Sequence, residues 1–361
     1  MNRRTFLAGG VAVAALGGLT AFSFARMGTL QEYAAVTAAA RAPLGQNPDP
    51  RSLVRYATLA ANGHNTQPWR FRISEQSIEI SPDFSRRTPV VDPDDHHLYA
   101  SLGCAAENLS LAAGAAGKHG DPVFDAAGKL VVRMEPGPAR SSVLFDAISA
   151  RQSTRADFDG RPIAPADLAQ LAAAAKLPGV ETVIITDPER RRRIRELVIA
   201  GNTAQMADPA FVAELKQWIR FNPRAAIESG DGILSAASGN PTLPTWLGVP
   251  MFDLVFQTDA ENKKYASQLD TSACIAVLVA EQDAPQYWVR AGRVCQRLAL
   301  QATALGLKCS FVNQPVEVAK FRPDLAALIG APGRRPNIVM RFGYGPDLPK
   351  SPRRPVEAVL A

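Results

Sequence analysis

Two apolar segments that repeat each other at a spacing of 189 residues place the strongest constraint on how this chain can fold. Residues 109–117 read LSLAAGAAG and residues 298–306 read LALQATALG. Upstream of them, Gly103 and Gly292 stand at the same spacing. Apolar residues at helical intervals, closed by a glycine, predict two helices with matching ends. The repeat predicts a chain of two duplicated halves, although helices rich in Ala and Gly can also match by composition alone.

Around this repeat, helical and strand-like patterns alternate. An alternating pattern at 69–73 and 77–80, with a polar break between, predicts a β-hairpin. Further strands are expected at 129–134, 182–185, 271–280, 309–312 and 337–342. Helices are expected at 30–40, 51–61, 92–117, 141–150, 188–200 and 285–306, and another opens at 164. The fold class predicted from these patterns is α+β.

The N-terminal 25 residues have the layout of an export signal. Arg3 and Arg4 precede an apolar run over 8–22, and residues 23–25 offer a small-x-small cleavage site. This resembles a twin-arginine (Tat) signal, which predicts export in the folded state to the periplasm or to the outer face of the inner membrane. An uncleaved anchor is the alternative, but the run is shorter than the ~20 residues that span a bilayer.

The remaining chain divides into a linker and two halves. We expect the linker at 26–50, the first half at 51–140 and the second half at 141–361. Within the second half, residues 201–269 contain a stretch rich in Gly, Ser and Pro. Long irregular stretches in a compact domain are usually lids or binding loops, so we expect this segment to be a lid-like insertion.

Composition excludes several classes of function. The net charge is +6, but the basic residues are scattered apart from Arg190–Arg193 and Arg353–Arg354, so a nucleic-acid partner is not expected. The four cysteines are far apart and have neither zinc-ligand nor CxxC spacing, which favours buried free thiols. No metal site and no disulfide framework are predicted.

Two polar motifs suggest a binding site. The first is the turn GHNTQPWRF at 63–71, which leads into a strand and can present amide and backbone groups to a flat polar heterocycle. The second is RQSTR at 151–155, at a helix end, which offers cations and a hydroxyl to a phosphate and an electron-rich ring. Each has a simpler reading: Trp69 can pack in the core, and Arg-x-Ser-x-Arg is often a surface cap.

Together these motifs resemble those of the nitroreductase (flavin reductase) superfamily. Its members carry Arg-x-Ser-x-Arg and Asn-x-Gln-Pro-Trp, and Gly343-Tyr-Gly345 with Arg353-Arg354-Pro355 also fits its C-terminal half. A typical member has the two motifs in the opposite order within one shorter subunit and builds its flavin sites across a dimer. The order here, with the export signal, resembles the Acg-type FMN-binding branch. The resemblance implies a nitroreductase-like fold whose two halves form a single-chain pseudo-dimer, acting as a monomer.

The resemblance also implies a set of FMN-binding residues. Arg151, Ser153, Arg353 and Arg354 are candidates for the phosphate, and Arg155 for the cation near N1 and the C2 carbonyl. Asn65, Thr66 and Gln67 would meet the pyrimidine edge, and the segment from Ser310 through Asn313 to Gln314 would lie near N5. His64 either faces the substrate or only supports the turn. No catalytic residue is identified.

The function implied is two-electron transfer through flavin N5 between a small-molecule donor and an acceptor. No GxGxxG motif follows a strand, so NAD(P)H as the donor rests on analogy. Two alternatives stay open: a non-catalytic protein that sequesters FMN under the 201–269 segment, and a membrane-attached structural protein. The sequence does not identify the substrate.

Overall fold

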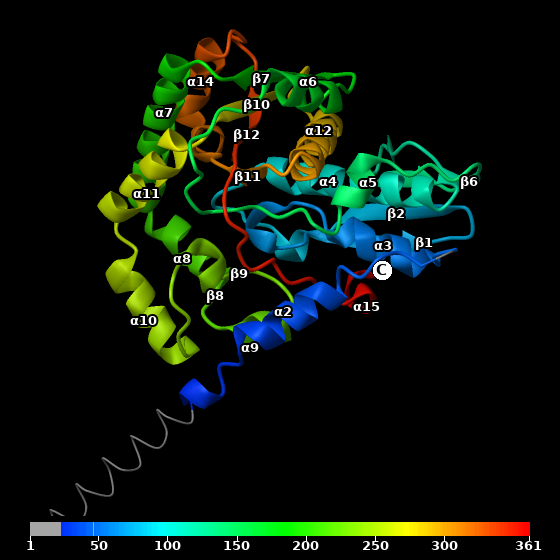
Figure 1. The fold of residues 1–361 in the computed structure, drawn as a ribbon, viewed down its shortest axis with the longest axis horizontal. Coiled ribbons are helices and arrows are strands. Elements are labelled where there is room, and N and C mark those ends of the chain that lie inside the picture. The colour runs from blue at the N-terminus through cyan, green and yellow to red at the C-terminus, as the bar shows by residue number, and fades with distance from the viewer. Residues whose placement is uncertain (1–22, 46) are drawn as a thin grey trace, which may run out of the picture.

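The structure is a computed structural model that describes residues 23–45 and 47–361 (Figure 1). The predicted export signal lies outside the described residues except at 23–25, and it stays a prediction. No helix among the described residues combines the length and the apolar character that crossing a membrane requires.

The first sheet is antiparallel and has the strand order β1-β2-β5-β4. The predicted hairpin is confirmed: Trp69 pairs with Pro82 and Ile73 with Ile78. Ile78 and Ile80 point into the core while their neighbours along the strand are partly exposed, so only one face of this sheet is covered. The strands are β1 Trp69–Ile73, β2 Ser77–Pro82, β4 Val123–Phe124 and β5 Leu130–Arg133.

The second sheet is also antiparallel, in the order β11-β12-β10-β7. Every residue of its central strand β10 is buried. Cys274, Ala276 and Leu278 join one hydrophobic cluster, whereas the residues between them join a second. This alternation means that helices cover both faces of the sheet. The strands are β7 Val180–Ile185, β10 Cys274–Ala280, β11 Lys308–Phe311 and β12 Pro336–Gly343.

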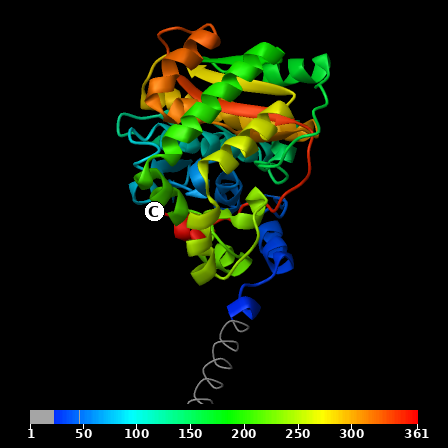
Figure 2. The same ribbon diagram turned by 90° about the vertical axis from the view of Figure 1, so that its left-hand side faces the viewer.

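Two long central helices, α4 (His96–Ala115) and α12 (Pro285–Ala304), lie between the sheets (Figure 1). The helices that accompany them are α3 Pro50–Thr58, α5 Val143–Ala147 and α6 Pro165–Ala174. The far face of the second sheet is covered by α7 Pro188–Met206, α11 Thr258–Asp270, α13 Gln314–Glu317 and α14 Arg322–Leu328 (Figure 2).

A third group of elements lies at the opposite end of the molecule from the second sheet (Figures 1 and 2). It consists of α2 Leu30–Ala39, α8 Pro209–Gln217, β8 Ile219–Arg220, α9 Pro223–Ser229, β9 Ile233–Leu234 and α10 Thr245–Val255. Most of the segment 201–269 belongs here, and it contains more regular structure than the sequence suggests. The two ends of this segment do not belong to the third group. Its first residues continue α7, and its last residues form α11, which packs against α7.

The C-terminal segment connects the second half to the first. After β12 the chain runs to the edge of β1, where Leu360 pairs with Phe71 and the Ala361 amide donates to the Phe71 carbonyl at 2.8 Å. Helix α15 (Val356–Val359) immediately precedes this contact and packs on α3 and β1. The last residues are therefore part of the first sheet.

The contact between α4 and α12 is reciprocal. Both ends of the two helices are separated by 189 residues, and the glycines that follow them, Gly117 and Gly306, have φ of 70° and 72°. A Cβ atom on Gly103 would collide with the Val289 carbonyl, and one on Gly292 would collide with the Ala100 carbonyl. Positions 100 and 289 have the same spacing, so each helix makes the same contact on the other, as in a two-fold interface.

We expect Gly103→Ala to destabilise the protein by roughly 3 kcal/mol, because the added methyl group meets backbone that cannot rotate away. Gly114→Ala in the same helix is the control: its Cβ would meet only the Arg140 carbonyl at 3.8 Å, and replacing a helical glycine adds up to ~1 kcal/mol. Urea unfolding of both variants measures the difference. Equal stability of the two would contradict the close crossing.

Candidate functional site

The polar turn at 63–67 has an unusual backbone. His64, Asn65 and Gln67 have φ of 45°, 56° and 53°, although none of them is glycine. Such conformations cost roughly 1–3 kcal/mol each and are kept where the surroundings fix them. Here the Gln67 amide donates to Asn62 Oδ1 at 2.8 Å, and the Thr66 amide donates to the Gly63 carbonyl at 2.8 Å. These hydrogen bonds therefore hold the turn in its strained conformation directly before β1.

The side-chain amides of Asn65 and Gln67 differ from the expectation that they face a flavin edge. Asn65 Nδ2 donates to the carbonyls of Gly232, at 3.0 Å, and of Pro352, at 3.2 Å. Gln67 Nε2 donates to the Gly230 carbonyl at 2.8 Å, and its Oε1 accepts from the Arg354 amide at 2.9 Å. Both amides are buried, and they tie the turn to the 201–269 segment and to the C-terminal segment.

A charged clamp reinforces this connection. Arg86, from the first half, donates to the Thr66 carbonyl and forms an ion pair with Asp231. Arg220 pairs with the same carboxylate, and the Arg86 guanidinium lies over the Trp218 ring. Burial raises the pKa of Asp231, but the hydrogen bonds from the two arginines outweigh it and hold the pKa below its usual value. Thr66 therefore contributes a buried backbone acceptor to the clamp.

The second motif lies along the edge of β11. Ser153 forms a parallel bridge with Cys309, and the Thr154 amide donates to the Cys309 carbonyl at 2.8 Å. Ser310 is buried within β11, where it pairs with Arg341 of β12. Ser153 itself is partly exposed. The pairing fixes the segment that ends in Arg155.

Five polar side chains from five separate elements lie near one another. The Arg155 and His97 charges both lower the pKa of His64, and Arg155 also acts on Tyr265. Glu317 acts on Tyr265, and His97 acts on Glu317, with 3.8 Å between His97 Nε2 and Glu317 Oε1. These couplings form a closed ring, which we call the ring recess.

The members of the ring recess are sheltered from solvent, because they combine partial exposure with strong desolvation. His64, Arg155, Tyr265 and Glu317 are all partly exposed, yet burial has the largest influence on the pKa of each. Groups on an open surface would be solvated and would not show this combination.

The charges in the ring recess are unevenly balanced. Burial, then Arg155 and His97, lower the pKa of His64 to about 4, so its imidazole is neutral at pH 7. Burial raises the pKa of Tyr265 to about 12 and that of Glu317 above its usual value. Within residues 23–45 and 47–361, no hydrogen bond or ion pair engages the Arg155 guanidinium. The recess therefore presents an unpaired cation.

Two buried polar atoms at this site also lack a partner within the described chain. They are His64 Nδ1 and Gln314 Oε1. The side chain of Gln314 contacts Tyr265, which places it beside the ring recess. Buried donors and acceptors are rarely left unpaired, so these atoms indicate an additional binding group.

The two C-terminal arginines lie in different environments, contrary to the expectation that both face a phosphate. Arg353 packs with Arg151: both donate to the Leu59 carbonyl, at 3.1 and 2.8 Å. Arg354 instead donates to the Ala358 carbonyl at 2.5 Å and lies 4.0 Å from Asp83. Arg354 therefore belongs to the outer edge of the first sheet and not to the cluster formed by Arg151 and Arg353.

Asn313 also has a structural role that the motif did not indicate. Its Oδ1 accepts from the Val339 amide at 2.8 Å, and its carbonyl accepts from the amides of Val316 and Glu317, both at 2.8 Å. These bonds hold the short helix α13 against β12. Asn313 thus positions Gln314 and Glu317 beside the ring recess.

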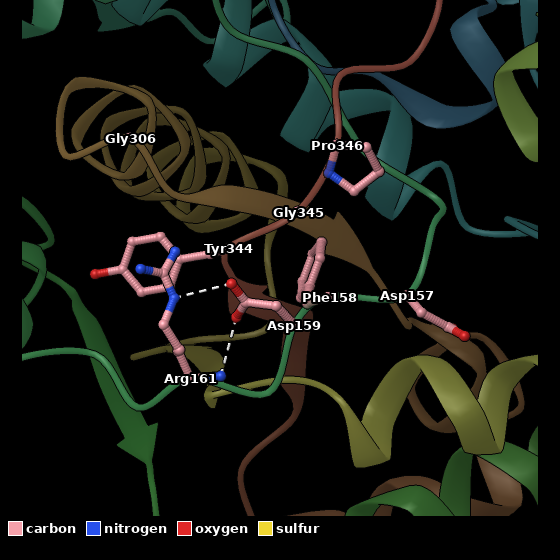
Figure 3. Close-up of a pocket in the computed structure, with 8 residues that line it drawn as sticks. All are labelled: Asp157, Phe158, Asp159, Arg161, Gly306, Tyr344, Gly345 and Pro346. Atoms are coloured by element: carbon pink, nitrogen blue, oxygen red, sulfur yellow. Dashed lines mark hydrogen bonds and ion pairs between the residues drawn. The ribbon is translucent and has the colours of Figure 1, made fainter.

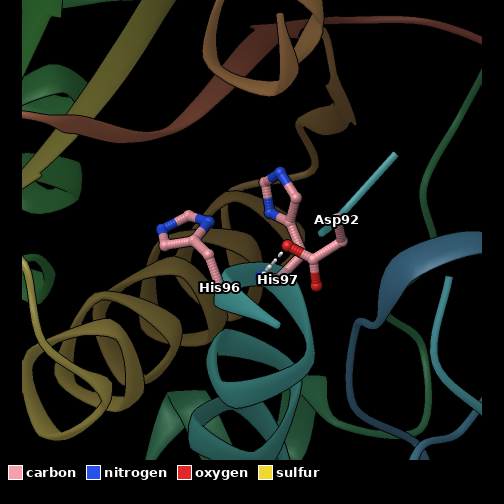
Figure 4. A group of neighbouring side chains, drawn as sticks. All are labelled: Asp92, His96 and His97. Carbon is pink, nitrogen blue, oxygen red and sulfur yellow. Dashed lines mark hydrogen bonds between the residues drawn. The ribbon is translucent and has the colours of Figure 1, made fainter. Parts of the chain in front are cut away.

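A group with metal-ligating side chains lies at the start of α4 (Figure 4). Asp92 accepts from the amides of His97 and Leu98, each at 2.9 Å, so its carboxylate caps the helix. The buried His96 ring lies with Nε2 3.0 Å from Asn337 Nδ2. Hydrogen bonds within the protein account for Asp92 and for one nitrogen of His96, whereas His96 Nδ1 is buried without a partner among the described residues. The absence of a metal site stays a prediction from the sequence.

A surface hollow of about 470 Å³ lies beyond the second motif (Figure 3). Phe158 and Tyr344 line it, and the Arg161 guanidinium stacks on the Tyr344 ring while bonding to Asp159. None of the ring recess residues lines this hollow. It is open to solvent and contains none of the unpaired polar groups, so we place the candidate site in the ring recess.

Sequence reasoning missed Tyr265, His97 and Glu317. Tyr265 lies in a polar helical stretch within the expected insertion, and nothing in its spacing distinguishes it. His97 follows His96 at a helix start, and this pair of adjacent histidines was the one sequence feature that could have indicated a site residue there. Glu317 follows closely after the Ser310–Gln314 segment and is the last residue of α13.

Comparisons with known proteins agree with the motifs. The profile of the Nitroreductase family matches residues 148–344. A Mycobacterium tuberculosis protein named "Putative NAD(P)H nitroreductase Rv3131" is 28% identical over 324 residues, which cover 86% of this chain and 90% of that protein. Another, named "Putative NAD(P)H nitroreductase acg", is 24% identical over 334 residues, covering 86% and 94%. Among solved structures, the FMN-dependent nitroreductase NfnB of Mycobacterium smegmatis in complex with NADPH is 15% identical, with a TM-score of 0.38 over 60% of this chain and 91% of that chain.

The desolvation of His64 predicts a pH dependence. Because its pKa of about 4 in the folded state lies below the value of 6.5 in an unfolded chain, acid protonates the unfolded state first. This contribution to stability is complete above about pH 6.5 and is lost as the pH falls toward 4. Histidine NMR titration should give the low pKa. Arg155→Gln should raise it, while Arg161→Gln, which removes an equal charge outside the recess, should leave it unchanged. Equal shifts of the His64 pKa in the two variants would contradict the placement of Arg155 beside His64.

Proposed function

The chain belongs to the nitroreductase family, and we propose that it is an FMN-dependent oxidoreductase in which one chain supplies both sides of a flavin site. The family match covers more than half of the chain and contains Arg151, Arg155, Tyr265 and Gln314. The strained turn with His64 lies outside the matched residues, in the first half. The single observation that carries the proposal is the unpaired Arg155 cation in a recess shared by both halves.

The residues fit FMN on two counts. At one end, the ring recess offers a cation and unpaired buried polar atoms, which suit a polar heteroaromatic ring. At the other end, Arg151 and Arg353 form a buried cationic cluster, which suits a phosphate. Asn65, which adjoins His64, accepts from Arg353 at 2.8 Å and connects the two ends.

When bound, FMN would supply the two-electron chemistry through its N5 atom. Arg155 would provide positive charge for the ring, and His64 would stay neutral beside it. Tyr265 would remain protonated at neutral pH and could donate a hydrogen bond to a bound acceptor. The names of the relatives support NAD(P)H as the electron donor. The substrate remains open.

We further propose that the chain is a single-chain pseudo-dimer that acts as a monomer. The reciprocal crossing at Gly103 and Gly292 supports this, because in a symmetric dimer the same contact would be made twice by identical residues. Only the second half carries Arg-x-Ser-x-Arg, and only the first carries Asn-x-Gln-Pro-Trp, so one flavin site is expected. Export by the Tat route remains a prediction, which N-terminal sequencing of the protein from the cell envelope would test.

The flavin proposal predicts that the purified protein binds FMN and that Arg155 sets its potential. Removing a charge-assisted interaction of ~1.5–3 kcal/mol in Arg155→Gln should lower the midpoint potential by about 30–60 mV. Arg161→Gln is the matched control, since this guanidinium pairs with Asp159 outside the recess. Spectroelectrochemical titration measures both. A protein that shows no absorbance from bound flavin after incubation with FMN would exclude the proposal.

Sequestration of FMN is the second candidate function, and the clamp at Asp231 favours it. Two arginines hold this residue of the 201–269 segment, and the Gln67 and Asn65 amides bind its neighbours Gly230 and Gly232. A segment held this firmly could shield a bound ring.

Stopped-flow reduction by NADPH distinguishes the two functions. If the protein is an oxidoreductase, NADPH should rapidly bleach the absorbance of the flavin bound to the native protein. If Asp231→Asn bleaches at least about tenfold faster than the native protein, the clamped segment is a barrier and sequestration is favoured. Asp253→Asn makes the same charge change at an exposed ion pair of α10 and is the control.

A further inference from the structure

Three arginine side chains are joined through two shared carbonyl oxygens. The Ser351 carbonyl accepts from Arg41 Nη2 at 2.9 Å and from Arg353 Nη1 at 3.5 Å. The Leu59 carbonyl accepts from Arg353 Nη2 at 3.1 Å and from Arg151 Nη2 at 2.8 Å. The three guanidinium groups therefore form one cluster, which we call the arginine cluster.

The arginine cluster has no negative partner within the described chain. None of its members makes an ion pair with a carboxylate among residues 23–45 and 47–361. Arg41 and Arg151 are 7% and 4% exposed. Lys350 adds a fourth positive charge: burial and then the Arg41 charge lower the pKa of its amine. Buried charges without a counter-charge are costly, so the cluster is poised to accept an anion.

Two buried donors in the cluster remain unused. Arg41 Nε and Arg151 Nε are buried and have no acceptor among the described residues. By contrast, all the nitrogens of Arg353 donate to carbonyls or to Asn65. The free donors therefore come from Arg151 and from Arg41, which lies outside the residues that match the family.

The segment that carries Arg41 is docked firmly, although the sequence suggests a linker at 26–50. A capping box between Thr29 and Glu32 starts α2. Tyr33 is buried, and its hydroxyl donates to the Lys350 carbonyl at 2.6 Å. Arg55 of α3 donates to the carbonyls of Ala40 and Ala42, at 3.1 and 2.6 Å. Arg41 is thus held in place from both sides.

We propose that Arg41 completes the anion site formed by Arg151 and Arg353, and that this site takes the phosphate monoester of the flavin cofactor. The proposal rests on the proposed function. A phosphate dianion would supply oxygen acceptors for the two free Nε donors and negative charge for the cluster. Residues before the family match would then select FMN over riboflavin.

A purely structural role for Arg41 makes a different prediction. Its Nη1 donates to the Thr37 carbonyl at 2.9 Å, so it also caps the C-terminal end of α2. If capping is its whole contribution, removing Arg41 lowers stability but affects flavins with and without a phosphate equally.

The test compares the dissociation constants of FMN and riboflavin for the flavin-free protein, measured by flavin fluorescence. Arg41→Met should weaken FMN binding by about tenfold or more and leave riboflavin binding unchanged. Arg41→Lys, which keeps the charge, should recover part of the difference. Arg51→Met is the matched control: it removes an equal charge at an exposed ion pair of α3, away from the cluster and from the contacts that hold Arg41, and it should keep the native ratio. An unchanged ratio in Arg41→Met would overturn the proposal, as would an equal loss for both flavins.

Inorganic phosphate separates this proposal from the proposed function. In the native protein, phosphate should compete with FMN but not with riboflavin, and it should raise the melting temperature less in Arg41→Lys. If neither flavin binds but phosphate still stabilises the native protein more than Arg41→Lys, the anion site stands and the flavin function fails. If flavins bind and phosphate never competes, the assignment of the site to a phosphate fails.

Discussion

The close crossing of α4 and α12 is the contact on which the rest of the structure depends. At Gly103 and Gly292 each helix touches the backbone of the other, a distance that no side chain larger than hydrogen allows. This contact joins the first sheet, packed on α4, to the second, packed on α12, in one continuous core. The turn at His64 precedes β1 of the first sheet, and the segment at Arg155 lies beside β11 of the second. The two motifs can therefore meet only because the helix crossing holds the two sheets together.

Much of the fold follows from sequence patterns. The hairpin of β1 and β2, the buried strand β10 and the ends of α4 and α12 each depend on local periodicity and on glycines that adopt positive φ, so they can be predicted. The segment 201–269 was harder, because its ends pack on α7 through tertiary contacts that leave no periodic signal. Residues 26–50 were also harder to predict, because the capped helix α2 lies within a segment that the sequence suggests is a linker.

The site was only partly accessible from the sequence. The motifs led to Arg151, Arg155 and His64, which lie where two halves meet. They could not show that the amides of Asn65 and Gln67 bind backbone carbonyls, because those carbonyls come from residues more than 160 positions away. Arg353 and Arg354 are adjacent in sequence yet lie in separate clusters, since successive side chains of an extended segment point in opposite directions. Tyr265 enters the site only through the packing of α11.

The C-terminal segment has a consequence for the order in which the protein can be completed during synthesis. Leu360 and Ala361 pair with Phe71, and Arg353 binds the last carbonyls of α3. Domains generally fold N-terminal first while the chain is still being made. Here the first sheet and the end of α3 must wait until residues 353–361 have left the ribosome. Neither half can be closed before that point, so a chain truncated before residue 353 would leave both unfinished.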